Sequence, residues 1–252
     1  GAHIDAVSAT FNQPMVPLAS VDDLRKHPVP LTIEPQPPGA FRWLGTDMVA
    51  FVPTGRMPMS TTYVATVGTG IASQLGRKLD APMTWEFTTP ALALASSSPG
   101  ISQEGVELTP VIRMVFNQRI DRKRVAEAVV LTGGGGKVAF EVRAQTLDAE
   151  GKVSELEQRT LSIQPTSALK RNTGYSVSLP AGVYGEGPNR SKKMTLQFRT
   201  YAPLRLSGPD CKGPNSYDCY PGSIQIASNN ALDGPTFEHH VTVEPPVKNL
   251  VV

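Results

Sequence analysis

The chain has 252 residues, of which 40% are hydrophobic and 18% are charged, with a formal net charge of +2. These values are typical of a globular protein with one to two domains. Because basic and acidic residues nearly balance, nothing favours nucleic acid or an anionic membrane as a partner. No apolar run approaches the roughly 18 residues of a transmembrane helix, so we expect no membrane-spanning segment.

The first residues, Gly1-Ala2-His3, have neither the basic start nor the apolar core of a signal peptide. Because an initiator Met is also lacking, we expect an excised piece of a longer chain, with any targeting signal outside it. The 23 prolines and 22 glycines separate short apolar runs. That pattern is typical of β proteins, because proline ends strands and begins turns.

About the first 90 residues alternate apolar and polar positions in short runs that predict strands. The expected strands are Ala6–Phe11, Leu31–Glu34, Phe41–Leu44, Val49–Val52, Thr61–Val67 and a last strand in which Trp85 and Phe87 share a face. Tyr63, Ala65 and Val67 are expected on one face of their strand. Val21–Lys26 is short and polar, which favours a turn, and Pro90–Gly100 is expected to be a linker.

The chain then repeats this plan. Pro53-Thr54 aligns with Pro165-Thr166 and Tyr63 with Tyr175, both offset by 112 (165−53 and 175−63), a separation that we call the repeat offset. The flanking sequences are also repeated: FNQ at 11–13 recurs at 116–118, and MTWEFTT at 83–89 recurs as MTLQFRT at 194–200. A period near a hundred residues, with about seven short strands expected in the first ninety, is typical of one immunoglobulin-like sandwich per repeat. We therefore predict an all-β fold of tandem Ig-like β-sandwiches, covering residues 1–93 and 101–205.

The second repeat contains the same kinds of signal. Its expected strands are Val111–Phe116, Ala128–Leu131, Val138–Arg143, Thr160–Ile163, Tyr175–Leu179 and Thr195–Thr200. Gly133–Gly136 lacks the Gly and Ser/Thr spacing of a phosphate-binding loop, so we expect a turn. The polar insert Thr146–Gln158 is expected to be an exposed hairpin tip. The basic cluster Arg119–Arg124 is interpreted as a solvated face, with a docking patch as the alternative.

Two tyrosines have the spacing of a structural motif. Met57 lies six residues before Tyr63, and Leu169 lies six residues before Tyr175. This spacing resembles the tyrosine corner of immunoglobulin and fibronectin type III domains, in which the ring packs at the core edge and the hydroxyl bonds to backbone upstream. We expect both tyrosines to be structural.

Residues 206–252 contain a cysteine loop and the first part of a third repeat. Ile224–Asp233 parallels Ile112–Asp121, and Phe237–Pro245 parallels the strand that follows. Because half a sandwich exposes strand edges, we expect it to pack on the second repeat or to pair with a neighbouring molecule. Cys211 and Cys219 lie in a turn-rich loop, which favours a local disulfide and an oxidising compartment; two free thiols are the alternative.

The sequence contains few residues that could perform chemistry. The adjacent pair His239-His240 on a predicted strand would point to opposite faces, and His3 and His27 stand apart, so we expect no metal site. Asp121 and Asp233 are interpreted as turn caps rather than calcium ligands. Glu155 and Glu157 lie in the polar insert and are expected to be solvated. No nucleophile has catalytic partners, so we predict a non-enzymatic chain without cofactors.

Three segments carry a family resemblance. FRWLGTDMVAFVPTGRMPMSTTYVATV resembles the bacterial Ig-like domains of surface-layer and envelope proteins. The run GEGPNRSKKMTLQFRTYAPLRL at 185–206, together with the Cys211…Cys219-Tyr220-Pro221-Gly222 loop and the SNNALDGPTFEHHVTVEPPV that follows it, is similar to the N-terminal region of large bacterial alpha-2-macroglobulin-like proteins. The resemblance implies a periplasmic, cell-envelope or extracellular protease trap, in which a bait is cleaved and a Cys-x-Glu-Gln thioester captures the protease.

No Cys-x-Glu-Gln motif is present, so no thioester residue is carried over to this sequence. The resemblance then implies a scaffold ahead of the trapping domains. The partners it implies are other domains of the same longer chain, with proteases and envelope proteins as further candidates. Two alternatives stay open: an Ig-like binding module for a protein or glycan, and an accessory domain of a secreted hydrolase. A stacking platform for sugars is disfavoured, because both tryptophans lie in strand patterns.

Overall fold

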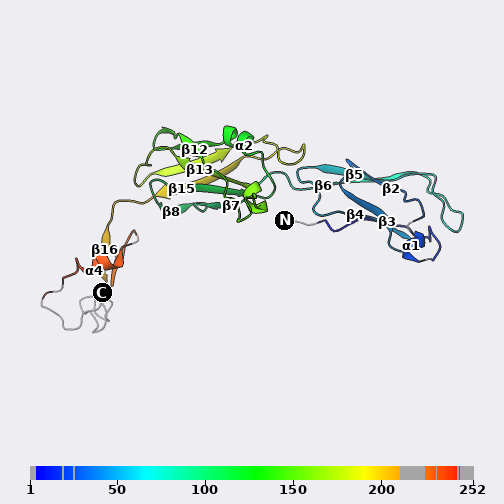
Figure 1. The fold of residues 1–252 in the computed structure, drawn as a ribbon, viewed down its shortest axis with the longest axis horizontal. Helices are drawn as coiled ribbons and strands as arrows, with labels where there is room; N and C mark the ends of the chain where they lie inside the picture. Colours follow the sequence, from blue (N-terminus) through cyan, green and yellow to red (C-terminus); the bar gives the residue numbers. More distant parts are fainter. Residues whose placement is uncertain are drawn as a thin grey trace.

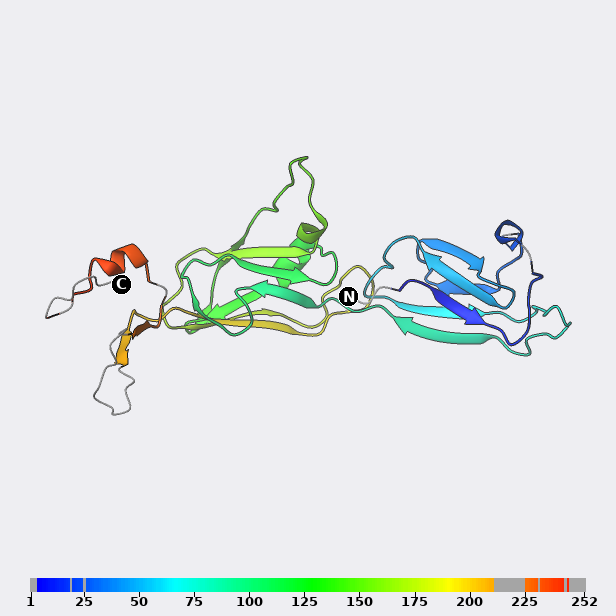
Figure 2. The same ribbon diagram turned by 90° about the horizontal axis from the view of Figure 1, so that it is seen from below.

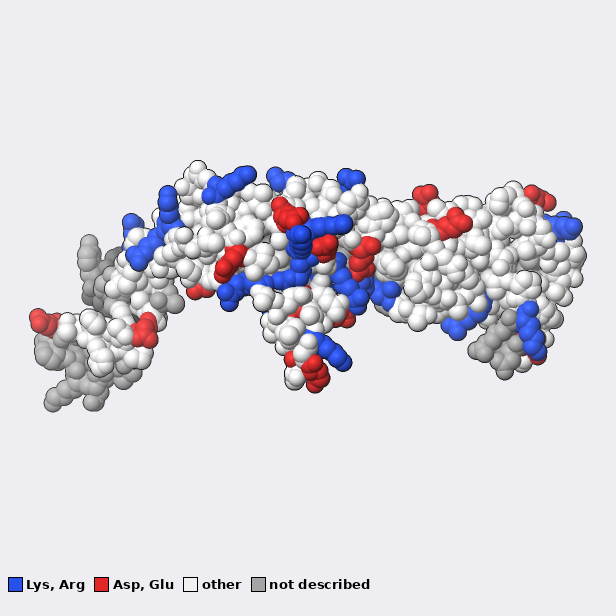
Figure 3. All heavy atoms as spheres, turned by 45° about the horizontal axis from the view of Figure 1, so that its top comes forward, with Lys and Arg blue, Asp and Glu red and all other residues white. Residues whose placement is uncertain are grey.

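The computed structural model describes residues 4–18, 20–24, 26–210, 225–230, 232–242 and 244. Two β-sandwiches follow one another along the long axis of the molecule (Figures 1 and 2). We call them repeat one and repeat two. Within the described residues no helix is both long and apolar enough to cross a membrane. On the face drawn in Figure 3, basic and acidic side chains are interspersed rather than separated.

Repeat one consists of two antiparallel sheets. The first has the order β1-β4-β3 and the second β2-β5-β6. Their bounds are β1 Val7–Thr10, β2 Leu31–Glu34, β3 Gly39–Trp43, β4 Met48–Pro53, β5 Thr62–Val67 and β6 Met83–Thr88. These strands confirm the sandwich that the alternating runs predicted.

The core of repeat one lies between the two sheets. Tyr63, Ala65 and Val67 of β5 are buried on one face, as their alternation predicted. Trp85 and Phe87 of β6 pack against the same core, which confirms their predicted common face. The Tyr63 and Phe87 rings stack with centroids 5.3 Å apart, so aromatic contact adds to apolar burial here.

The turn expected at Val21–Lys26 is instead a one-turn helix, α1 (Val21–Leu24). The Ser20 hydroxyl accepts the backbone N–H of Asp23 at 3.3 Å and donates to its carboxylate at 2.7 Å. This cap satisfies a donor that a helix start leaves free. Leu24 is buried in the core of repeat one, so a single apolar anchor and a serine cap suffice to form a turn of helix.

Repeat two has larger sheets. One has the order β11-β10-β14-β15-β8 and the other β12-β13-β9-β7. The bounds are β7 Leu94–Ser98, β8 Gln103–Val106, β9 Ile112–Phe116, β10 Val130–Gly133, β11 Gly136–Lys137, β12 Phe140–Val142, β13 Thr160–Pro165, β14 Gly174–Leu179 and β15 Met194–Thr200. The predicted glycine turn is confirmed, since Gly134 and Gly135, both at positive φ, connect β10 to β11.

The interpretation of Pro90–Gly100 as a linker is wrong, because β7 lies within it. β7 pairs antiparallel with β9, and β8 then adds in parallel to the edge of β15. β7 reads LASSS and is mostly exposed, so its strand conformation comes from backbone pairing rather than from side-chain burial.

A helix was also missed, because Ala128 ends α2 (Arg122–Ala128) and the following strand, β10, begins only at Val130. Asp121 is a cap, as predicted, but it caps this helix by accepting the backbone N–H of Arg124 at 3.1 Å. Arg122 is not simply solvated, since its guanidinium donates to the carbonyls of Thr160 and Arg143.

The polar insert forms a hairpin that projects from the side of repeat two (Figure 2), closed by a bridge between Leu147 and Val153. It ends in a short helix, α3 (Glu155–Gln158), in which the expectation for Glu157 is wrong. Its side chain is buried, accepts from Arg113 Nη2 at 2.5 Å and accepts the backbone N–H of Thr146 at 3.3 Å. A buried carboxylate needs such partners to offset its lost hydration.

The third segment lies beyond the end of repeat two that faces away from repeat one (Figure 1). β16 (Leu206–Asp210) pairs antiparallel with β17 (Gln225–Ser228), and α4 (Gly234–Glu238) follows, capped by Asp233. The strand predicted from Phe237 is wrong at its start, because Phe237 belongs to α4 and His239 is its C-terminal cap. Cys211 and Cys219 lie outside the described residues, so their disulfide stays a prediction.

Candidate functional site: the junction between the repeats

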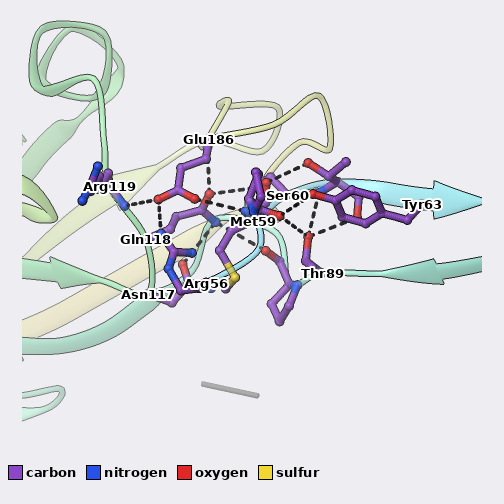
Figure 4. Close-up of polar contacts among 12 residues, drawn as sticks. Arg56, Met59, Ser60, Tyr63, Thr89, Asn117, Gln118, Arg119 and Glu186 are labelled. Carbon is purple, nitrogen blue, oxygen red and sulfur yellow. Dashed lines mark hydrogen bonds and ion pairs between the residues drawn. The ribbon is translucent and has the colours of Figure 1, made fainter. Parts of the chain in front are cut away.

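A network of polar contacts lies between the two sandwiches (Figure 4). Four segments meet there, and together we call them the junction. They are the loop between β4 and β5 (56–61), the crossing between the repeats (89–93), the turn after β9 (117–119) and the hairpin tip ahead of β15 (185–189).

Gln118 lies at the centre of the junction and is 1% exposed, beside Ser60, which is fully buried. The Ser60 hydroxyl donates to Gln118 Oε1 at 2.9 Å, and the backbone N–H of Glu186 donates to the same oxygen at 2.8 Å. The Ser60 N–H donates to the carbonyl of Pro90 at 3.0 Å, and the Ser60 carbonyl accepts the N–H of Asn189 at 2.7 Å. One buried residue of repeat one is thus bonded to two segments of repeat two and to the crossing.

Glu186 connects the repeats electrostatically. Its carboxylate accepts from Arg56 Nη2 at 2.5 Å and from the backbone N–H of Met59 at 3.0 Å, both in repeat one. It also accepts the N–H of Arg119 in its own repeat at 3.1 Å. Burial alone would raise the pKa of this carboxyl, but the bonds from Arg56 and the two backbone N–H groups outweigh that effect and hold the pKa below its ordinary value. The ionised form is therefore the one that closes the junction.

Two glycines allow the hairpin tip to approach. A Cβ at Gly185 would lie 2.6 Å from the Ser60 hydroxyl oxygen, and one at Gly187 would lie 2.6 Å from the carbonyl oxygens of Met59 and Ser60. Such distances are far below van der Waals contact. Gly187 therefore permits backbone atoms of the two repeats to meet directly, and Gly185 leaves room for the Ser60 side chain.

Thr89 connects the junction to the core of repeat one. Its hydroxyl donates to the carbonyl of Pro58 at 2.9 Å, lies 3.1 Å from the carbonyl of Thr61 and accepts the N–H of Thr61 at 3.0 Å. The Tyr63 hydroxyl donates to the same Pro58 carbonyl at 3.1 Å, five residues upstream. Burial raises the pKa of Tyr63, so this hydroxyl stays protonated and remains a donor.

The second predicted tyrosine, Tyr175, has the corresponding place at the far end of repeat two. Its hydroxyl accepts the backbone N–H of Lys170, again five residues upstream, at 2.8 Å. Pro58 is the counterpart of Lys170 at the repeat offset and has no N–H, so Tyr63 must donate where Tyr175 accepts. Both hydroxyls thus bond to the backbone of the loop before their strand.

The described residues contain no group of three or more His, Cys, Asp or Glu side chains placed to hold a metal. The carboxylate at the junction is already bonded to three donors within the protein, which leaves it poorly placed for proton transfer. What this geometry can do is hold two domains at a fixed separation and angle.

Sequence reasoning missed the junction. FNQ at 116–118 was recognised only as part of a repeat, and Gly185-Glu186-Gly187 only as part of a family resemblance. The informative signal was the pair of glycines on either side of a single acidic residue in a short loop, since glycine permits close backbone approach.

Comparison with known proteins identifies the two sandwiches. Residues 2–89 and 90–200 each match the family described as Bacterial Ig-like domain. The chain belongs to the bacterial Ig-like domain family. The two Ig-like matches meet between Thr89 and Pro90, the residues that carry the crossing at the junction.

The bacterial Ig-like domains of this chain are also similar to part of a larger protein. An alpha-2-macroglobulin homolog of Nostoc sp. (strain PCC 7120) is 22% identical over 272 residues, covering 98% of this chain. The chain spans 14% of the length of that relative. The expected tandem Ig-like fold and its relationship to an alpha-2-macroglobulin homolog are thereby confirmed.

Proposed function

We propose that this chain is a non-catalytic scaffold of a bacterial envelope protease inhibitor of the alpha-2-macroglobulin type. Its Ig-like domains form a rigid spacer that precedes the protease-trapping domains of the same longer chain and fixes their distance from the start of that spacer. The relationship to an alpha-2-macroglobulin homolog over 98% of the chain supports the parentage. The Ig-like family, whose role depends on the surfaces that its members present, supports a structural or interaction role.

One observation carries the proposal: the junction is a hydrogen-bonded contact with a buried centre rather than a flexible linker. Ser60 and Gln118 are buried in it, and the Glu186 carboxylate bonds to both repeats. Flexible linkers between domains are instead exposed and rich in Gly, Ser or Pro, with few contacts across them. The junction therefore makes two domains into one stiff unit, which is the property that a spacer needs.

Nuclear magnetic relaxation of backbone ¹⁵N nuclei tests the stiffness. We expect amides of both sandwiches to fit a single elongated rotational diffusion tensor. Two independent tensors, one for each repeat, would contradict the scaffold function, because a loosely joined pair cannot set a distance.

The inhibitor parentage has its own test with the full-length protein. Incubation with proteases is expected to give a covalent adduct that survives denaturing electrophoresis. The 252-residue chain alone should give none, because it lacks a Cys-x-Glu-Gln motif. An adduct formed by this chain alone would contradict a purely scaffolding role, and no adduct with the full-length protein would contradict the inhibitor parentage.

An envelope or extracellular location accompanies this proposal, together with a disulfide between Cys211 and Cys219. Intact mass after thiol alkylation, with and without reductant, tests both on protein recovered from its native compartment. Resistance to alkylation until reduction supports an oxidising compartment. Free alkylation of both thiols would contradict the disulfide and the location argued from it.

A further inference from the structure

The described part of the third segment copies the crossing between repeats one and two. Asn117 accepts the N–H of Ala93 at 2.9 Å, and its own N–H donates to the Ala93 carbonyl at 3.0 Å. Asn229, the counterpart of Asn117 at the repeat offset, makes the same two bonds with Arg205, at 2.7 and 3.2 Å. Arg205 is itself the counterpart of Ala93, since 205−93 equals 229−117.

The strands and the cap repeat with the same offset. β7 pairs with β9 with Leu94 opposite Phe116, and β16 pairs with β17 with Leu206 opposite Ser228. Both members of the second pair follow their counterparts by the repeat offset (206−94 and 228−116). Asp233, which caps α4, follows the cap of α2 by the same offset. The third segment therefore begins an Ig-like domain in the register of repeat two.

In both complete repeats, one amide side chain receives a donor from a hairpin of its own domain. Gln13 Oε1 accepts from the Ser73 hydroxyl at 2.7 Å, and Gln118 Oε1 accepts from the backbone N–H of Glu186 at 2.8 Å. The two donors lie in hairpins closed by bridges at Ala72–Lys78 and Tyr184–Arg190, which are again separated by the repeat offset. Each hairpin precedes the last strand of its repeat.

Among the residues that the structure describes, the third amide side chain has no such donor. Asn230 is the counterpart of Gln118 at the repeat offset, and its Nδ2 donates to the carbonyl of Ala202 at 2.8 Å, as Gln118 Nε2 does to Pro90 at 3.4 Å. Its Oδ1 is buried and has no hydrogen-bond partner among the described residues. A buried acceptor without a partner is destabilising, so native proteins rarely retain one.

We propose that Asn230 Oδ1 is the docking point for a hairpin of a third Ig-like domain, begun by β16, β17 and α4. The occupant is chain that follows in the longer protein, with its hairpin one repeat offset beyond Tyr184–Arg190. A longer protein is expected because this chain spans 14% of its relative. The inference rests on the proposed scaffold, since it extends the array by one domain.

Hydrogen exchange measured on the full-length protein and on the 252-residue chain tests the proposal. We expect amides of β17 to exchange at least about tenfold more slowly in the full-length protein, because docking buries them. Asn230→Ala should abolish most of that difference. It should accelerate exchange less in the shorter chain, where it removes only the bond to Ala202, than in the full-length protein. As a matched control, Asn229→Ala removes bonds to residues 203 and 205 that exist in both chains, so its effect should be equal in both.

Equal exchange of β17 in the two chains would overturn the proposal. So would protection of β17 that appears in the shorter chain only with rising protein concentration, since a second copy would then be the occupant. Failure of the scaffold is distinguishable, because it appears as independent tumbling of repeats one and two while β17 is protected.

Discussion

Replacing Glu186 with glutamine should destabilise repeat one, although residue 186 belongs to repeat two. The carboxylate accepts two bonds from repeat one, from Arg56 Nη2 and Met59 N. A hydrogen bond to a charged group contributes about 1.5–3 kcal/mol when buried, and an exposed ion pair about 0.2–1 kcal/mol. The Glu186 side chain is 17% exposed and that of Arg56 38%, which places these bonds between the two cases. Because the amide retains one acceptor, we expect repeat one to lose about 1–2 kcal/mol of unfolding free energy.

The chain offers a selective assay. Both tryptophans, Trp43 and Trp85, lie in repeat one, so tryptophan fluorescence during urea unfolding reports on that repeat, whereas far-UV circular dichroism reports on both. Glu127→Gln, on the exposed side of α2, is the matched control and should shift the fluorescence transition by less than about 0.5 kcal/mol. If Glu186→Gln shifts it no more than the control does, the repeats are not coupled through this carboxylate.

The same geometry gives three further predictions. Because the folded pKa of Glu186 is lowered, its contribution to the unfolding free energy of repeat one is complete above the ordinary glutamate value of about 4.3 and is lost as pH falls through the folded pKa. The wild-type and Glu186→Gln fluorescence transitions should therefore converge below about pH 4. A difference between them that stays constant with pH would contradict the assignment. Gly187→Ala should force the hairpin tip away from Met59 and Ser60 and give two rotational diffusion tensors, whereas Gly151→Ala in the exposed insert should retain one. Tyr175→Ala should cost repeat two about 2–4 kcal/mol by circular dichroism and Tyr175→Phe about 0.5–1.5 kcal/mol, so a loss below about 0.5 kcal/mol for alanine would count against a structural role for this tyrosine.

The sandwiches could be predicted from sequence because their strands bury alternate residues. β5 is the clearest case, with Tyr63, Ala65 and Val67 buried and the residues between them not. A half-buried strand leaves this period of two in its sequence, and the period survives without knowledge of the partner strand.

The missed elements lack such a period. α2 buries only Val125, so a helix of seven residues leaves no apolar stripe to recognise. β7 is a mostly exposed, serine-rich edge strand, and its conformation depends on β9, which lies further along the chain. Glu157 reads as a solvated residue until the fold places Arg113 beside it, 44 positions away.

The junction was beyond sequence reasoning for a related reason. Several of its contacts join residues 58 to 130 positions apart, as in Ser60 with Gln118 and Arg56 with Glu186. No local spacing encodes which loops will meet. The repeat offset can be read from the sequence. The role of Gln118 Oε1 as an acceptor cannot, because its donor is the N–H of Glu186 in the hairpin tip, 68 positions away.

Much of the contact between the repeats involves main-chain atoms. The N–H groups of Met59, Ser60 and Asn189 and the carbonyls of Ser60 and Pro90 take part in three of the hydrogen bonds that cross it. Main-chain groups are the same whatever side chains surround them, provided that glycine is kept where the tip approaches. Such a coupling is portable: an Ig-like unit that differs elsewhere on its surface, but keeps Glu186, Gln118 and their partners Arg56 and Ser60 in the joining loops, can be inserted into the row without a new interface. Chimeric arrays assembled at the boundary between Thr89 and Pro90 are therefore expected to retain the spacing of the parent.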